Sequence, residues 1–171
     1  TWWSYNNEEN EIIDSNIYSN RGSGIIFQPT NNNNNICNCK IYSNKQYGLW
    51  LYKAKYNNIS YCEIYSNKDG GIYKCFSPTK HNVVYNCTIH SHEGAGIIYF
   101  LDVKENTITK CTFYSNNGCN IALESVQNNN IIANRFFDPR TLVYDDIENE
   151  NFFEGNYWAE YEGVDSDGDG Y

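Results

Sequence analysis

The C-terminal residues carry acidic side chains in a pattern that suits a cation. Asp165, Asp167 and Asp169 alternate along the chain and are followed by Gly170, as in the first half of an EF-hand calcium loop. Calcium takes several oxygen ligands on a tight turn, and glycine permits that turn. The bidentate acid that usually follows is missing, so other residues must complete the site, with Tyr171 as a candidate. We predict calcium as a cofactor here; the alternative is a solvated acidic tail.

A column of tyrosines returns at a nearly constant interval and is a candidate contact surface for sugar. Its members are Tyr18, Tyr42, Tyr65 and Tyr114, with His90 and Phe137 at equivalent positions. Each follows an apolar residue by one position, so in a strand these side chains point away from the core. Exposed aromatic rings stack against sugar rings or form a lateral contact with another molecule. The alternative is a self-stacking ladder that only stabilises the sheet.

Four of the seven cysteines share one column of the same repeat. They are Cys39, Cys62, Cys87 and Cys111. Small inward side chains at this position would form a ladder along a core. Such a ladder could form disulfides or bind metal, or it could be a file of buried thiols that act as small apolar groups. We favour the buried thiols, because no Cys-x-x-Cys pair suggests zinc or redox chemistry.

Groups suited to catalysis are sparse. Glycosidases use two carboxylates roughly 5 to 10 Å apart, and no two acids share a column among the candidates Asp69, Glu93, Asp102 and Glu124. His90 and His92 stand where other repeats carry tyrosine and asparagine, so we interpret them as substitutes within the repeat rather than as an acid–base or metal cluster. The sequence favours a protein that is not an enzyme.

These residues belong to a repeat that runs through most of the chain. A representative copy is the segment Cys62-Glu63-Ile64-Tyr65-Ser66-Asn67, and its serine returns at positions 19, 43, 66, 91 and 115. The steps between these serines are 24, 23, 25 and 24 residues. A fixed period of this size indicates stacked repeats, in which each copy buries its apolar face against its neighbours.

Short alternating runs within each copy predict strands of three to five residues. Three apolar columns recur: Ile12, Ile36, Ile59, Val84, Ile108 and Ile131; then Ile17, Ile41, Ile64, Ile89, Phe113 and Phe136; then Ile25, Leu49, Ile72, Ile97 and Ile121. Three such columns per turn predict an all-β fold, a right-handed parallel β-helix (β-solenoid) of about six to seven coils of about 24 residues. With strands about 4.8 Å apart, this rod would be roughly 30 Å long.

Asparagine also keeps to the repeat. Asn10, Asn34, Asn57, Asn82, Asn106 and Asn129 occupy one column, where stacked amides can bond to the copies above and below. We therefore place the β-helix at residues 10–150. An N-terminal cap or docking segment takes residues 1–9, and a C-terminal cap with the Asp-rich loop takes residues 151–171. Trp2, Trp3 and Trp158 are candidates for a joint between subunits or for caps over the open ends.

Charge and hydropathy exclude some partners. The net charge of −9 and the pI of about 4.7 argue against nucleic acid or an anionic membrane. No apolar run approaches the roughly 18 residues that span a bilayer, so we predict no membrane span in this segment. The chain starts at Thr1 and contains no methionine, which is typical of a processed or trimmed piece of a longer product.

The repeats, with their recurring Asn-x-Ile and Gly-Ile elements, resemble those of the NosD-type β-helix family. The ending from Asn156-Tyr157-Trp158 to the Asp-rich loop is similar to a tail that closes such domains in secreted and surface proteins of archaea and bacteria. This chain departs from the family in carrying cysteine where asparagine is usual. The resemblance implies the fold, an extracellular or cell-surface location, and a surface or polysaccharide-related role. It transfers no catalytic residue, and copper delivery is not supported because methionine is absent and histidine is sparse.

Two functions of different classes follow from these patterns. The first, which we favour, is an extracellular structural module: a homo-oligomeric, self-assembling subunit of a surface layer or filament, joined end to end with calcium at the C-terminal loop. A short solenoid has unpaired strand edges at both ends, and these invite stacking unless they are capped. The second is a carbohydrate-binding or polysaccharide-cleaving β-helix protein that uses the outward tyrosines.

Overall fold

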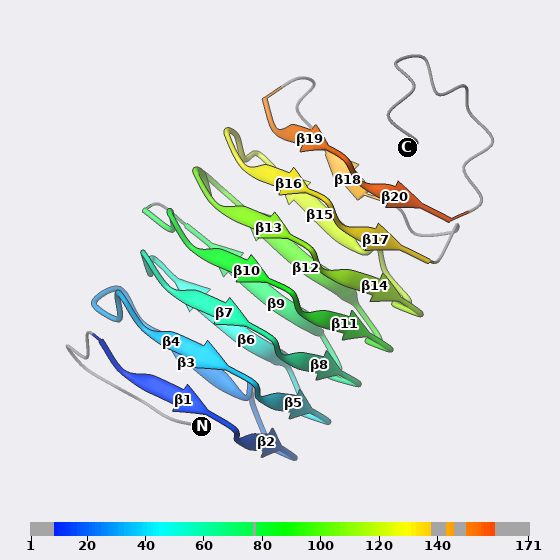
Figure 1. Ribbon diagram of the computed structural model, residues 1–171. Coiled ribbons are helices and arrows are strands. Elements are labelled where there is room, and N and C mark those ends of the chain that lie inside the picture. The colour runs from blue at the N-terminus through cyan, green and yellow to red at the C-terminus, as the bar shows by residue number, and fades with distance from the viewer. Residues whose placement is uncertain (1–8, 77, 138–142, 146–149, 160–171) are drawn as a thin grey trace.

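The computed structural model describes residues 9–76, 78–137, 143–145 and 150–159, and all regular structure in these ranges is β-strand. The chain winds as a right-handed parallel β-helix of about six turns, in which the coils stack like the steps of a ladder (Figure 1). Within the described residues no helix is long and apolar enough to cross a membrane. The predicted all-β parallel β-helix is therefore confirmed.

The coils build three parallel sheets, and each sheet takes one strand from successive turns. The first sheet contains β1 (Glu11–Ile13), β4 (Asn35–Cys37), β7 (Asn58–Ser60), β10 (Val83–Tyr85), β13 (Thr107–Thr109), β16 (Asn130–Ile132) and β19 (Phe152–Glu154). The second sheet contains β2 (Asn16–Tyr18), β5 (Lys40–Tyr42), β8 (Glu63–Tyr65), β11 (Thr88–His90), β14 (Thr112–Tyr114), β17 (Arg135–Phe136) and β20 (Tyr157–Trp158). The third sheet contains β3 (Ile25–Phe27), β6 (Tyr47–Tyr52), β9 (Gly70–Cys75), β12 (Ala95–Phe100), β15 (Ile121–Glu124) and β18 (Val143–Asp145).

The strands of the third sheet differ from the expected length. β6, β9 and β12 have six residues each, where three to five were expected. Glycine at the corner explains the difference, because a Cβ on Gly48 would lie only 2.8 Å from the carbonyl oxygen of Gly71. Neighbouring coils therefore approach closely at this corner, and parallel pairing begins before the apolar run.

The coils also continue past residue 150, into the segment predicted as a C-terminal cap. β19 pairs with β16, and β20 pairs with β17. The reason lies in two asparagines, because the side chains of Asn129 and Asn134 donate to Asn151 and Asn156 as earlier coils do to their successors. The Asp-rich part of that segment lies outside the described residues.

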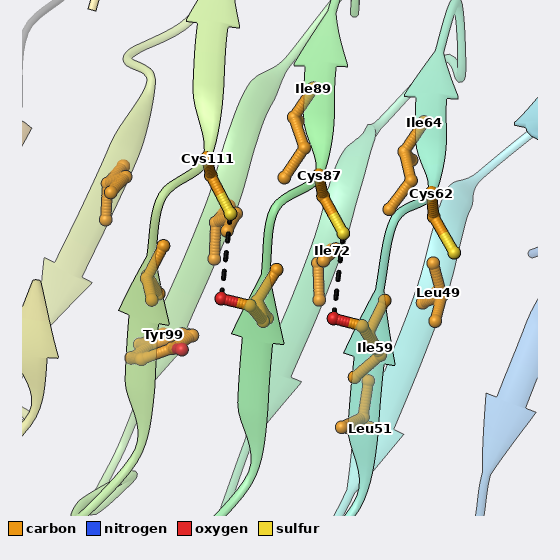
Figure 2. Close-up of a cluster of buried hydrophobic side chains, with 14 of the residues drawn as sticks. Leu49, Leu51, Ile59, Cys62, Ile64, Ile72, Cys87, Ile89, Tyr99 and Cys111 are labelled. Carbon is orange, nitrogen blue, oxygen red and sulfur yellow. Dashed lines mark hydrogen bonds between the residues drawn. The ribbon is translucent and has the colours of Figure 1, made fainter. Parts of the chain in front are cut away.

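The core follows the predicted apolar columns. Most of their members are completely buried, among them Ile36, Ile64, Leu49 and Ile72. Figure 2 shows Leu49, Ile64 and Ile72 among the buried side chains between the sheets. Toward the C-terminal end the column of the second sheet becomes aromatic. The ring of Trp158 stacks on Phe136 at a centroid distance of 4.4 Å. Trp158, predicted at a subunit joint, thus continues the core.

Amide ladders hold the corners. In the ladder predicted from the sequence, the backbone and side-chain nitrogens of Asn57 both donate to Asn82 Oδ1 at 3.0 Å, and Asn82 repeats these bonds to Asn106. A second ladder runs through Asn20, Asn44, Asn67 and Asn116, with His92 in the place of one amide. His92 Nδ1 accepts from the backbone N–H of Asn67 at 3.1 Å, so its predicted role as a substitute for asparagine is confirmed. Burial lowers the pKa of His92 to about 4.

The cysteine column lies inside the core, next to the corner between the first and second sheets. Cys39, Cys62, Cys87 and Cys111 are at most 2% exposed, and all seven cysteines of the chain are free thiols. Figure 2 marks the contact of Cys87 Sγ with the carbonyl oxygen of Ile59 in the preceding coil, at 3.6 Å. Asn134 donates to the equivalent carbonyl of Ile108 at 2.9 Å. The thiols therefore occupy asparagine positions as weaker donors.

Candidate functional site

An unbroken stack of rings covers the outer face of the second sheet. The centroid distances are 5.0 Å for Tyr18–Tyr42, 4.8 Å for Tyr42–Tyr65, 5.2 Å for Tyr65–His90 and 4.4 Å for His90–Tyr114, with interplanar angles of 2° to 10°. Strand register explains the stack, since each ring lies directly over the equivalent residue of the next coil. We call these five residues the tyrosine ladder. His90 therefore takes a tyrosine position, as predicted.

The stacked geometry decides how the tyrosine ladder can contact a ligand. Tyr42 and Tyr65 have a neighbouring ring against both faces, so a sugar ring cannot stack on either of them. Ring edges and phenol hydroxyls remain for the solvent side. The ring faces are therefore used up by self-stacking, as in the alternative prediction. The hydroxyls of Tyr18, Tyr42 and Tyr65 form a row of hydrogen-bonding groups with one group per coil, and His90 interrupts this row before Tyr114.

A polar row runs beside the tyrosine ladder on the same sheet. Lys40 Nζ lies 3.1 Å from Glu63 Oε2, and His90 Nε2 lies 3.6 Å from Glu63 Oε1, too far for a hydrogen bond. The hydrogen bond from Lys40 holds the pKa of Glu63 below its usual value. Burial lowers the pKa of His90. Glu63 is thus an ionised acceptor whose charge Lys40 offsets.

A column of cations lies at the corner where the second sheet ends. Backbone bonds from Lys45 to Asn20 and from Lys68 to Asn44, each 3.0 Å long, place Arg21, Lys45 and Lys68 over one another in successive coils. We call these three residues the basic column. All three side chains are exposed, and none takes part in an ion pair with another described residue.

Sequence reasoning missed the basic column, although a signal was present. Arg21, Lys45 and Lys68 each lie two residues after the repeat serine. The column changes character in the next coil, where the backbone N–H of Glu93 bonds to Asn67 and places a carboxylate at the equivalent position.

A second aromatic surface lies on the third sheet. Tyr47 stacks on Tyr73 at 4.6 Å, and the Trp50 ring lies 6.0 Å from Tyr73 at an angle of 47°. The Trp50 Nε1–H donates to Cys75 Sγ at 3.1 Å. In this column the register places Ile26 before Trp50 and Ile98 after Tyr73. This cluster is therefore confined to β6 and β9 and does not repeat along the rod.

The remaining predicted site residues are not brought together by the described structure. Asp165, Asp167, Asp169, Tyr171, Trp2 and Trp3 lie outside the described residues, and within those residues no three side chains form a candidate metal cluster. At the N-terminal end, a hollow of about 600 Å³ is lined by inward residues of the first coil, including Ile12, Ile17 and Phe27. The calcium and subunit-joint predictions remain predictions.

Stacked coils with inward apolar columns, amide ladders at the corners and three parallel sheets define a parallel β-helix protein. The chain belongs to the family described as "Right handed beta helix region", which it matches over residues 3–157. This match does not extend to the narrower NosD-type resemblance or its C-terminal tail. We found no significant match among curated proteins.

Two solved structures share the fold. The crystal structure of the periplasmic alginate epimerase AlgG superposes with a TM-score of 0.74 and 16% sequence identity, covering 86% of this chain and 39% of that chain. The crystal structure of the pectate lyase Pel9A superposes with a TM-score of 0.59 and 15% identity, covering 92% of this chain and 50% of that chain. This chain thus spans half or less of either protein, and the likeness at such identities concerns the fold.

Proposed function

We propose that this protein binds a polysaccharide along the tyrosine ladder. The carrying observation is the in-register ring stack of Tyr18, Tyr42 and Tyr65, which repeats one phenol hydroxyl per coil on the outer face of the second sheet. The strand spacing sets a repeat of about 4.8 Å along the rod. A linear polymer of repeating sugar units can present hydroxyl groups to such a row at regular intervals, so that many individually weak hydrogen bonds act on one chain.

The fold neighbours support this function over the structural module favoured from the sequence. AlgG is named for its action on alginate and Pel9A for its action on pectate, and both are polysaccharides. A filament or surface-layer role finds no such support. A location outside the cytoplasm is part of the proposal, in keeping with the periplasmic location given for AlgG.

Binding, rather than cleavage by a carboxylate pair, is the proposed activity. Among the described strands of the second sheet, Glu63 is the one carboxylate, and Lys40 already engages it at 3.1 Å. Hydrolysis of a glycosidic bond by paired acids needs a second carboxylate roughly 5 to 10 Å away. Glu63 and the neighbouring lysine can instead accept and donate hydrogen bonds to sugar hydroxyls.

A glycan-binding screen with a hydroxyl-deleted variant tests the proposal. Tyr18→Phe/Tyr42→Phe/Tyr65→Phe keeps the stacked rings and removes three hydroxyls. We expect affinity for the best glycan to fall by about tenfold or more, since each hydrogen bond contributes about 0.5–1.5 kcal/mol. The control is Tyr56→Phe, because Tyr56 is exposed and stacked on His81 at a different corner. No glycan binding, or equal loss in both variants, would contradict the proposal.

A further inference from the structure

We infer that the polysaccharide bound at the tyrosine ladder is anionic, and that the basic column selects it by contacting its negative charges. This inference rests on the proposed function and adds a substrate class to it. The basic column (Arg21, Lys45 and Lys68) runs parallel to Tyr18, Tyr42 and Tyr65 and lies three residues further along each coil. A chain lying on the hydroxyl row would therefore have a row of cations along one side.

The cations are available to a ligand. Three other surface lysines of the described structure have acidic partners: Lys40 pairs with Glu63, Lys80 with Glu105, and Lys104 with Asp102. The exposed Lys110 and Arg135, like the basic column, belong to none of the ion pairs between described residues. None of these ion pairs includes Arg21, Lys45 or Lys68, and their side chains are exposed.

The basic column contrasts with the overall negative charge of the chain. The whole chain carries a net charge of −9, so an acidic polymer is repelled by most of the surface and attracted where cations gather. One solvated cation contributes little, because water weakens the attraction. Three cations on successive coils act together on one polymer, and such multivalent attraction accumulates. The basic column therefore favours a ligand that is itself a row of charges.

The length of the anion-binding site follows from the point at which the residues of this column change from basic to acidic. Glu93 takes the position equivalent to Lys68 in the next coil, because its backbone N–H bonds to the carbonyl of Asn67. The basic column spans the coils of β2, β5 and β8, so we expect it to hold three consecutive charges of the polymer. Glu93 should oppose a fourth, which makes it the residue that ends the anion-binding part of the ladder.

The test compares two forms of one sugar polymer. The probes are a polygalacturonate oligosaccharide and the same oligosaccharide with its carboxylates methyl-esterified, titrated by calorimetry at two salt concentrations. The variants are Arg21→Gln/Lys45→Gln/Lys68→Gln and, as a gain of charge, Glu93→Lys. The matched control is Lys55→Gln/Lys80→Gln/Lys104→Gln, which changes the net charge equally at a different corner, where these lysines also lie over one another in successive coils.

We expect the acid form to bind about tenfold tighter than the ester at low salt, and this preference to shrink as salt screens the charges. The basic-column variant should lose about tenfold affinity for the acid form, the matched control about twofold or less, and Glu93→Lys should gain about threefold. Circular dichroism of each variant checks that the fold is retained.

Several results would overturn the inference. Equal, tyrosine-dependent binding of acid and ester would leave the proposed function standing and remove the anionic class. If neither form binds and the glycan screen finds no ligand, both the proposed function and the anionic class of the ligand are contradicted. A single-stranded oligonucleotide that binds as tightly and depends on the same three cations would mean a general polyanion site and overturn the assignment to polysaccharide.

Discussion

The amine of Lys74 lies 2.9 Å from the hydroxyl oxygen of Tyr99 in the middle of the core, and both side chains are completely buried. They belong to β9 and β12 and are in register, in a column that carries Leu51 before them and Leu123 after them. Figure 2 shows Tyr99 among the buried apolar side chains. Burial lowers the pKa of Lys74 to about 7 and raises that of Tyr99 well above its ordinary value. The core therefore holds a polar pair where other coils hold leucine.

This pair should make stability depend on pH above neutrality. An unfolded Lys74 keeps its proton up to about pH 10.5, while the folded one loses it near pH 7. The unfolded state binds more protons between these values, so stability rises with pH, by about 1.4 kcal/mol per unit from this group. This pH dependence is measured by urea denaturation of the wild type and of the double variant Lys74→Leu/Tyr99→Phe at pH 7, 8 and 9. We expect the double variant to be more stable at pH 7 and the difference to shrink by pH 9. A constant difference would contradict the assignment.

His92 should make the fold sensitive to acid. Its pKa of about 4 lies below the ordinary value of 6.5 because the ring is buried. The unfolded state takes up the proton first as pH falls, so the stability contributed by neutral His92 is present above about pH 6.5 and is lost as pH falls toward 4. The variant His92→Asn restores the amide ladder and serves as the reference. Relative to it, the free energy of unfolding of the wild type should fall by about 3 kcal/mol as pH is lowered from 6.5 to 4. Parallel acid titrations of the two proteins would contradict this account.

The amide ladder should be a large source of stability. Asn82 is completely buried, accepts two bonds from Asn57, and donates to Asn106 and to the carbonyl of Ala54. Asn82→Ala leaves several of these groups unsatisfied, so we expect a loss of about 3 kcal/mol or more in the free energy of unfolding. Asn117→Ala, at an exposed corner, should change it by less than about 0.5 kcal/mol. Equal effects of the two variants in urea denaturation would count against a structural role for the ladder.

The fold was readable from the sequence because one coil repeats. The columns of Ile36, Ile64 and Ile72 each recur at a step of about 24 residues, and in a parallel helix such a step places like residues over one another. The six-residue strands were not readable, since they depend on the close approach of backbones at Gly48 and Gly71. The pairing of Lys74 with Tyr99 was also missed, because a charged residue inside a strand is normally expected to face solvent.

The candidate site was only partly readable. The tyrosine column was visible, but whether its rings would stack on one another or stay open to a ligand depends on side-chain rotamers that no spacing specifies. The repeat places Lys40 over Glu63, since each lies three residues before its repeat serine, but the contact between the two side chains again depends on their rotamers. The basic column was predictable from the sequence, because its three residues each lie two positions after the repeat serine.

The Asp-rich C-terminal loop gives a prediction of its own. Calorimetry should detect calcium binding that is lost in Asp165→Asn/Asp167→Asn/Asp169→Asn, because calcium needs these carboxylate oxygens. Light scattering with calcium and then with a chelator tests the end-to-end assembly predicted from the sequence. Particles that shorten on chelation would support a calcium-dependent joint, and monomers under both conditions would remove the assembly.

A crystal structure with a bound oligosaccharide tests the central claim most directly. The ligand should be an anionic oligosaccharide of about six units, so that it spans more than the three coils of the basic column. We predict sugar hydroxyls in hydrogen-bond contact with Tyr18, Tyr42 and Tyr65, and carboxylates facing Lys45 and its column neighbours. Sugar bound instead on the third sheet, stacked against Trp50 with the tyrosine ladder unoccupied, would contradict the proposed site.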